Sequence, residues 1–323
     1  FNIFVVSFAL VFSSSVFANK IGVVYDSGGK FDKSFNELAF KTAERVKNEL
    51  GWEMVEFESS NDAQIEQGMR KIADRGATMI VGMGFAQADA VAAVSADYPD
   101  IKFVAVDVCW LDDPNNNIYQ ACYKEHEGSF LVGMMAAMAS KTGTIGFVGG
   151  MDIPLIRKFQ GGYEQGAQYV NPDIEVLANM TGTTNEAWNN PTKGAELTKA
   201  QIDGGADVVY QAAGGTGIGV LQAAADAGIM GIGVDANQNW MHPGNMLTSM
   251  LKRLDLTIFA QAEAIAAGTF EPSGQFLSLG LAEGGVGYAT EDGMVTDEMA
   301  AAADAAAADI ASCAIVVADW SQE

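Results

Sequence analysis

The chain has 323 residues and a mass of 34.0 kDa, which suits two domains better than one. Hydrophobic residues make up 49% and charged residues 18%, so the chain can bury a core and is not disordered by composition. The 41 acidic and 18 basic residues give a formal charge of -23, which excludes nucleic acid and anionic membranes as general surface ligands. Two histidines and three cysteines exclude most zinc clusters built from Cys and His.

The first 18 residues predict a secretory signal peptide. Residues 1–12 (FNIFVVSFALVF) are uncharged, and small residues follow up to Ala18, as in an apolar signal region and its cleavage site. The alternative is a membrane anchor, which needs about 20 apolar residues. Because polar Asn19 and Lys20 follow at once, we expect a mature chain that begins near Asn19 and lies in the periplasm. No cysteine lies near the cleavage site, so no lipid anchor is expected.

From Lys20 onward, short apolar runs alternate with amphipathic stretches. We expect strands at residues 21–25, 52–57, 78–81 and 103–106, and helices at 34–50, 63–75 and 86–96. This βαβα order predicts an α/β fold, with a doubly wound parallel sheet that is covered by helices on both faces.

The second half of the chain repeats this order. Strands are expected at 144–148, 174–177, 206–210 and 231–235, with helices at 157–169, 195–202 and 219–227. Gly22 and Gly146, in the first strand of each half, are 124 residues apart, and Asp107 and Asp235, after the fourth, are 128 apart. A nearly constant separation predicts an internal repeat and two lobes, although βαβ units can also resemble each other by chance.

Parallel sheets of this kind bind ligands at the carboxyl ends of their strands. If these edges of the two lobes face each other, Asp107 and Asp235 lie on opposite walls of a cleft. Such pairs of lobes close on a ligand by hinge motion.

The periplasm permits disulfides. Cys109 follows a predicted strand and Cys122 lies in the next extended segment, so they either form a bridge or remain two free thiols. Cys313 is left over in both cases.

No catalytic constellation is visible in the sequence. The glycine cluster at residues 214–219 fails the G-x-G-x-x-G spacing, because Val220 stands at the last glycine position. Neither G-x-S-x-G nor a phosphate-binding P-loop motif occurs. We expect His126 on a solvated helix face and His242 in a loop. The sequence therefore favours a binding protein without cofactor or metal over a secreted enzyme.

The chain resembles the basic-membrane-protein (PnrA-like) family of solute-binding proteins, whose best-known members are purine nucleoside receptors of ABC importers. The resemblance extends from Lys20 to about Trp320. Its motifs occur in family order at residues 32–36 (DKSFN), 124–131 (KEHEGSFL), 149–167 (GGMDIPLIRKFQGGYEQGA), 212–217 (AAGGTG) and 248–254 (TSMLKRL).

This resemblance implies the type I periplasmic binding fold, in which two doubly wound lobes are joined by a three-strand hinge. The first lobe would comprise residues 19–124 and 248–277, and the second lobe residues 125–247 and 278–323. The helix at 254–267 would then lie on the first lobe, and the alanine-rich run 299–308 would pack on the second.

The resemblance also implies a set of ligand-binding residues: Asp26, Ser34, Phe35, Asn36, Asp107, Trp188, Gly215, Thr216, Asp235 and Lys252. Phe35 and Trp188 would stack on the two faces of a purine base. Asn36 would read the edge of the base, and Asp235 with Lys252 would hold the ribose hydroxyls. The sequence departs from the family at Asn190, where a turn usually carries Asp; this departure affects the turn and not the aromatic ring beside it.

Each of these residues also has a purely structural interpretation. Phe35 can pack in the core, Asp26 can cap a turn, Asp107 and Asp235 can cap loops, and Lys252 can be a solvated lysine.

The implied function is capture of a purine nucleoside, such as adenosine, guanosine or inosine, by a monomer that delivers it to the permease of an ABC importer. A free base, a pentose or another small polar solute are alternative ligands on the same fold.

Overall fold

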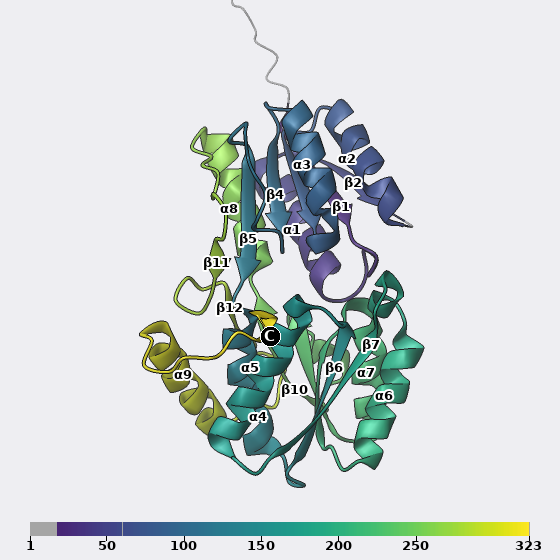
Figure 1. Cartoon of the computed structure of the whole chain (residues 1–323), viewed down its shortest axis with the longest axis vertical. Helices are drawn as coiled ribbons and strands as arrows, with labels where there is room; N and C mark the ends of the chain where they lie inside the picture. The colour runs from purple at the N-terminus through teal and green to yellow at the C-terminus, as the bar shows by residue number, and fades with distance from the viewer. Residues whose placement is uncertain (1–17, 60, 323) are drawn as a thin grey trace, which may run out of the picture.

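The computed structural model describes residues 18–59 and 61–322. Residues 1–17, which hold nearly all of the expected signal peptide, lie outside this range. The described chain forms two α/β lobes stacked end to end (Figure 1).

The first lobe contains a six-stranded sheet in the order β11-β5-β4-β3-β1-β2. Its strands are β1 (Lys20–Tyr25), β2 (Glu53–Glu58), β3 (Met79–Met83), β4 (Lys102–Val106), β5 (Ile118–Tyr123) and β11 (Ser278–Leu279). Its helices are α1 (Phe35–Leu50), α2 (Ile65–Asp74), α3 (Ala88–Asp97) and α8 (Leu254–Ala267). All strand pairs of this sheet are parallel.

The second lobe repeats this plan, with strand order β12-β10-β9-β8-β6-β7. Its strands are β6 (Thr144–Met151), β7 (Glu175–Gly182), β8 (Val208–Ala212), β9 (Met230–Asp235), β10 (Met246–Lys252) and β12 (Val286–Tyr288). Its helices are α4 (Glu125–Ala139), α5 (Pro154–Val170), α6 (Pro191–Asp203), α7 (Gly217–Asp226) and α9 (Asp297–Ala311). Only the short β12 is antiparallel to its neighbour. The matching strand order supports the predicted internal repeat.

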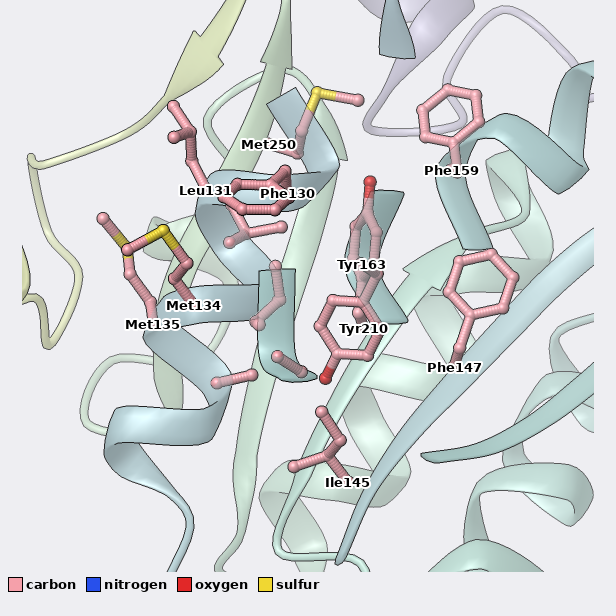
Figure 2. Packing of buried hydrophobic residues seen from close by; sticks show 14 of the residues in the cluster. Phe130, Leu131, Met134, Met135, Ile145, Phe147, Phe159, Tyr163, Tyr210 and Met250 are labelled. Atoms are coloured by element: carbon pink, nitrogen blue, oxygen red, sulfur yellow. The ribbon is translucent and has the colours of Figure 1, made fainter. Parts of the chain in front are cut away.

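Both faces of each sheet are buried, as the apolar strands require. In β1, Ile21, Val23 and Tyr25 pack toward α1 and α8, whereas Val24 packs toward α2 and α3. The core of the second lobe is centred on three rings, those of Phe147, Tyr163 and Tyr210, with centroids 5.1–6.3 Å apart (Figure 2). Residues of α9 complete this cluster, so the alanine-rich helix packs against the core of the second lobe.

The lobes are joined where the chain passes from β5 to α4, from β10 to α8, and onward from β11. The second passage differs from the sequence expectation. The chain does not leave the second lobe at Thr248, because β10 pairs in parallel with β9 through Leu251. It leaves at Arg253, where α8 begins and packs beside α1. The last passage follows Leu279, since β11 pairs with β5.

Cys109 and Cys122 form a disulfide between the loop after β4 and strand β5. The bridge closes a short loop, for which a disulfide contributes about 2–4 kcal/mol to folding. Cys313 is free and exposed. In the described part of the chain, none of the helices is long and apolar enough to cross a membrane.

Candidate functional site: a cavity between the lobes

The carboxyl ends of the strands in the two sheets face each other across a narrow cavity, as the fold class requires. The cavity has a volume of about 60 Å³. The cavity is therefore a slot. Its lining consists of Asp26, Gly28, Asp32, Phe35, Gly84, Phe85, Asp107, Leu155, Ile156, Phe159, Trp188, Ala212, Gly214, Val234, Asp235 and Lys252.

Two aspartates occupy equivalent positions on the opposite walls. Asp107 follows β4 and Asp235 ends β9, and both are buried. Both also have left-handed backbone conformations, with φ of 62° and 64°. Positive φ is uncommon outside glycine, and such residues cluster at functional sites. The repeat thus places one carboxylate on each lobe at the same point of the fold.

Lys252 ends β10, lines the cavity and is almost completely buried. Its Nζ lies 2.7 Å from Asp107 Oδ2 and 3.2 Å from Glu125 Oε1. Burial opposes its charge, but the carboxylates of Asp107, Glu125 and Asp235 outweigh burial and raise the pKa of Lys252. Lys252 is thus ion-paired with Asp107 and Glu125, and it acts on Asp235, its predicted partner in holding a ribose, by Coulomb attraction without a direct ion pair.

Three aromatic rings surround the same ammonium group. Its Nζ lies 5.1 Å from the ring centroid of Phe35, 5.2 Å from that of Tyr123 and 5.7 Å from that of Phe159. These distances suit cation–π attraction. Phe35 and Phe159 come from different lobes and both line the cavity, so the charge of Lys252 is fixed where the two lobes meet.

Asp235 has unused hydrogen-bonding capacity. Its Oδ2 lies 2.9 Å from the hydroxyl of Ser34 in the other lobe, whereas its buried Oδ1 has no hydrogen-bond partner among the residues that the structure describes. Burial raises the pKa of Asp235, while Lys252 and Ser34 oppose this rise. An unsatisfied buried acceptor is costly, and so Oδ1 is suited to accept a hydrogen bond from a ligand.

Asp107 is the second acidic group with a perturbed proton affinity. Burial raises the pKa of Asp107 to about 6; Lys252 opposes this rise and Glu125 reinforces it. Its proton affinity therefore depends on charges from both lobes, since Glu125 lies at the start of α4.

Asn36 does not reach the cavity, contrary to the prediction that it reads a base edge. It is fully buried, its Oδ1 accepts from the amide of Asp26 (3.1 Å), and its Nδ2 donates to the carboxylates of Asp26 and Asp32. Asp32, which is not among the predicted site residues, accepts from the backbone amides of Ser34, Asn36 and Glu37 and so caps α1. Burial raises the pKa of Asp32 to about 7, against these amides. Asn36 thus positions Asp26, which does line the cavity.

Ser34 and Thr216 also have positioning roles and are absent from the cavity lining. The Ser34 hydroxyl lies 2.9 Å from both Val234 O and Asp235 Oδ2, and joins the lobes directly. The Thr216 hydroxyl donates to Ala187 O (2.7 Å) and accepts from the amide of Asn190 (2.6 Å), which fixes the turn that carries Trp188.

Glycines allow the two lobes to approach closely. Gly214 lines the cavity, whereas Gly215, the glycine predicted to do so, lies beside it. A Cβ at Gly215 would lie 3.1 Å from Gly28 O of the opposite lobe. Its small size therefore serves the contact between the lobes.

Phe35 and Trp188 line the cavity from opposite lobes, as the resemblance implied. The Trp188 ring packs against Gly150, where any side chain would collide with it. Sequence reasoning missed Phe85 and Phe159, which also line the slot. Both could have been found: Phe85 lies two residues after the end of β3, and Phe159 lies in the first half of the helix after β6, the counterpart of the Phe35 helix.

His126 is not on a solvated face. It is 8% exposed because the first turns of α4 are enclosed by α5 and β10, and burial lowers its pKa. Its neighbours in the KEHEG segment organise the hinge. Glu125 pairs with Lys252 and Lys158, and Glu127 accepts from the amide of Leu281 at 2.8 Å. Within the described ranges, no three His, Cys, Asp or Glu side chains are grouped as metal ligands would be.

Comparisons with known proteins agree with this architecture. Residues 18–319 match the family described as ABC transporter substrate-binding protein PnrA-like. Basic membrane protein A2 of Borrelia garinii is 34% identical over 87% of this chain and 82% of its own length. A protein of Lactococcus lactis named as an ABC transporter nucleoside-binding protein is 31% identical, over 83% of this chain and 80% of its own. An uncharacterized lipoprotein of Pyrococcus furiosus is 33% identical over 85% and 71%.

Solved structures show the same fold. An ABC transporter solute-binding protein from Aeropyrum pernix superposes with a TM-score of 0.83 at 27% identity, over 93% of each chain. One from Conexibacter woesei gives a TM-score of 0.74 at 25% identity, over 94% of this chain and 99% of the other. Two doubly wound lobes joined by three chain passages constitute the type I periplasmic binding fold. The chain therefore belongs to the PnrA-like, basic-membrane-protein family of substrate-binding proteins of ABC transporters, which bind a solute and are not enzymes.

Proposed function

We propose that this substrate-binding protein captures a purine nucleoside between its lobes and delivers it to the permease of an ABC importer. The observation that carries the proposal is the buried Asp235 Oδ1, which lines an aromatic slot without a hydrogen-bond partner among the described residues. A ribose hydroxyl is a donor of the right kind for this oxygen, and a charged acceptor makes the stronger hydrogen bond.

The aromatic lining supports a purine as the other half of the ligand. Trp188 and Phe35 approach the slot from opposite lobes, and a narrow slot between rings suits a flat π-system. Base–aromatic stacking is worth about 1–3 kcal/mol per base. Asp26, Asp32, Asp107 and Asp235 outnumber the single Lys252 in the lining, and this balance disfavours a phosphate and favours a nucleoside over a nucleotide. The name of the Lactococcus relative points to the same ligand class.

We assign the ligand contacts to Asp26, Phe35, Asp107, Trp188, Asp235 and Lys252, and we add Phe85 and Phe159. Ser34, Asn36, Gly215 and Thr216 act by positioning these groups or the lobes. The protein works outside the cytoplasm, a compartment in which the Cys109–Cys122 disulfide persists. It acts as a monomer, because the two lobes of one chain complete the cavity.

Calorimetry with a ligand series tests the proposal. Adenosine, guanosine or inosine should bind more tightly than adenine, guanine or hypoxanthine, and all of these more tightly than ribose. A free base leaves Asp235 Oδ1 unsatisfied, which costs about 1–3 kcal/mol or more for a charged group. Asp235→Ala should therefore reduce the difference in affinity between nucleoside and base, and should change the affinity for the base little.

The outcomes of this series separate the rival ligands. If the free base binds the parent protein as tightly as its nucleoside, the ribose role of Asp235 is wrong and the protein is a base receptor. If ribose binds as tightly as the nucleoside, the aromatic slot does not bind a base. Mass spectrometry of small molecules released from the purified protein on denaturation provides an independent identification.

A further inference from the structure

A second cavity adjoins the central slot on the side of the hinge, and we call it the hinge groove. It shares Phe85, Asp107 and Leu155 with the slot. Its other lining residues are Cys109, Trp110, Cys122, Ile153, Pro154, Lys158, Phe276, Ser278, Asp319 and Ser321. The two cavities therefore adjoin each other at these three side chains.

The hinge groove is far roomier than the slot. Its volume is about 550 Å³, which lies within the range of small-molecule pockets. Its walls are mostly apolar, and two large aromatic side chains are solvent-exposed at its edge: Trp110 is 48% exposed and Phe276 is 72% exposed. Exposed aromatics of this size around a concave surface indicate a binding site.

The charges in the groove are already paired. Lys158 lies 3.3 Å from Glu125 and 3.9 Å from Asp319, and Asp107 is bound by Lys252. The groove thus offers apolar contact without a free charge to recognise an ion, so the group that it suits is uncharged and apolar.

The aromatic wall is held rigidly. The disulfide joins Cys109 to Cys122, and the amide of Phe276 donates to Cys109 O at 2.6 Å. Gln275 Nε2 donates to Trp110 O at 3.2 Å. Phe276 itself has φ of 64°, a conformation that is rare for a bulky residue and persists only where its surroundings impose it. This arrangement keeps an aromatic ring exposed to solvent at the groove.

The shared residues indicate which end of a ligand faces the groove. Asp107 lines both cavities and is bound to Lys252, so the groove opens from the carboxylate side of the slot. Trp188, the proposed base contact from the second lobe, lines the slot and not the groove. Asp235, the proposed ribose acceptor, lines the slot but not the groove, so this orientation requires Asp107 to contact the ribose as well, from the opposite wall. The sugar end of the nucleoside then points toward the groove.

We propose that the hinge groove is a subsite for an apolar substituent at the 5′ position of a purine nucleoside. The inference rests on the proposed function. It extends the substrate class to nucleosides whose 5′ hydroxyl is replaced by an uncharged thioether or similar group. Continuity with the slot argues for part of the same ligand as the occupant. Trp110 and Phe276 supply the contact area for it.

Two matched ligand pairs test this orientation by calorimetry. The first pair is 5′-S-methyl- and 5′-S-benzyl-5′-thioadenosine, and the second is N6-methyl- and N6-benzyladenosine. Burial of the added ring in an apolar groove should make the 5′-benzyl compound bind about tenfold more tightly than the 5′-methyl compound, a difference of about 1.4 kcal/mol. The N6-benzyl compound should bind more weakly than N6-methyladenosine, because the closed slot has no room for the ring.

Two tryptophans provide matched variants. Trp110 and Trp240 both follow equivalent strands, β4 and β9, and are about half exposed, but Trp240 lines neither cavity. Trp110→Ala should abolish most of the preference for the 5′-benzyl compound and leave adenosine affinity unchanged, and Trp240→Ala should change neither. Phe276→Gly, which suits the positive φ, should act like Trp110→Ala.

The possible outcomes keep the inference distinct from the proposed function. If adenosine binds but benzyl is favoured at N6 or at neither position, the subsite is wrong and nucleoside binding stands. If Trp110→Ala weakens adenosine and the 5′-benzyl compound equally, the groove is not a separate subsite. If no nucleoside binds the parent protein, the proposed function fails and the subsite fails with it. Unchanged thermal unfolding of each variant confirms that folding is intact.

Discussion

The two aspartates at the strand ends show how the repeat makes a binding site. Asp107 and Asp235 share position, burial and left-handed backbone, yet their surroundings differ. Asp107 is neutralised by Lys252, whereas Asp235 accepts from the neutral hydroxyl of Ser34 and keeps one oxygen available. The repeat thus places two carboxylates at equivalent positions, and the different side chains that they contact give them different hydrogen-bonding states.

Trp188 provides the most direct test of stacking. Trp188→Ala should weaken adenosine binding by about 1–3 kcal/mol, the worth of one base–aromatic contact. Adenosine should also quench or shift the tryptophan fluorescence of the parent protein and much less that of the variant. Trp240→Ala is the control, since this ring lies outside the slot. Equal affinities of Trp188→Ala and the parent protein would rule out stacking at this position.

The affinity for nucleoside should depend on pH through Asp107. Its folded pKa of about 6 lies above the ordinary value of 3.8, because burial disfavours the ionised form. Its contribution to folding stability is therefore present at low pH and lost as the pH rises through about 6. The affinity for nucleoside should depend on pH in the opposite direction. The ionised carboxylate of Asp107 is the hydrogen-bond acceptor and the partner of Lys252, so affinity should fall as the pH drops from 7.5 to 5.

A comparison with Asp107→Asn isolates this effect. Asp32, whose pKa burial raises to about 7, titrates in the same range, so the parent curve contains more than one group. The difference between the parent and Asp107→Asn in calorimetric affinity should change with a midpoint near pH 6. A difference that stays constant from pH 5 to 7.5 would mean that Asp107 does not change its protonation in the binding reaction.

At the scale of elements, the fold was predictable because strands and helices follow from local sequence patterns, and these patterns occur twice in the chain. Apolar runs followed by amphipathic stretches predicted the strands and helices in order, and the constant separation of the halves predicted two lobes. The predicted position of the second chain passage between the lobes was wrong, because the resemblance put the return to the first lobe at Thr248. Strand β10 pairs with β9 through Leu251, and such a pairing cannot be read from a local sequence pattern.

The sequence predicted several of the residues that line the slot, but it did not predict the hydrogen bonds that the polar side chains make. Phe35, Trp188, Asp107, Asp235 and Lys252 all line the slot, as the motifs implied. Asn36 and Thr216 belong to the same motifs, but their side chains bind neighbouring loops, and a sequence does not reveal which way a polar side chain points. The partner of Lys252 was also beyond sequence reasoning, since Asp107, Glu125 and Asp235 are distant in the chain.

Glycines in α5 make the packing of α4 against α5 testable. A Cβ at Gly166 would collide with the carbonyl oxygen of Phe130, and one at Gly162 with that of His126. Gly→Ala inside a helix ordinarily stabilises it by about 0.5–1 kcal/mol. Gly166→Ala should instead lower the free energy of unfolding by about 1–3 kcal/mol, because the helices must separate.

Urea unfolding followed by circular dichroism measures this loss. Gly287→Ala is the control, because a Cβ there meets no atom within 4 Å. We expect Gly287→Ala to change the free energy of unfolding by less than about 0.5 kcal/mol, as for most surface substitutions. An equally stable Gly166→Ala variant would show that the helix pair is less tightly packed than the structure describes.

At the scale of the whole molecule, direct hydrogen bonds hold the two lobes together. Ser34 Oγ lies 2.9 Å from Val234 O and Asp235 Oδ2, and Gln238 Nε2 donates to Lys33 O at 3.1 Å. The slot between them is too narrow to admit a nucleoside from solvent, so the lobes must separate before a ligand enters. Closure is then a shift in population from the open to the closed form, and both the ligand and the hydrogen bonds between the lobes stabilise the closed form.

Ser34→Ala should shift this balance toward the open form. A hydrogen bond to a charged group is worth about 1.5–3 kcal/mol net, so losing it lowers the ratio of closed to open protein about tenfold or more. Small-angle scattering should therefore show a larger radius of gyration for unliganded Ser34→Ala than for the unliganded parent. Ser95→Ala is the control, because this buried hydroxyl donates to Ala92 O within α3 and touches no other lobe. Saturating adenosine should bring all three proteins to one compact radius of gyration. If adenosine binds Ser34→Ala and leaves the radius of gyration of this variant unchanged, hinge closure is contradicted.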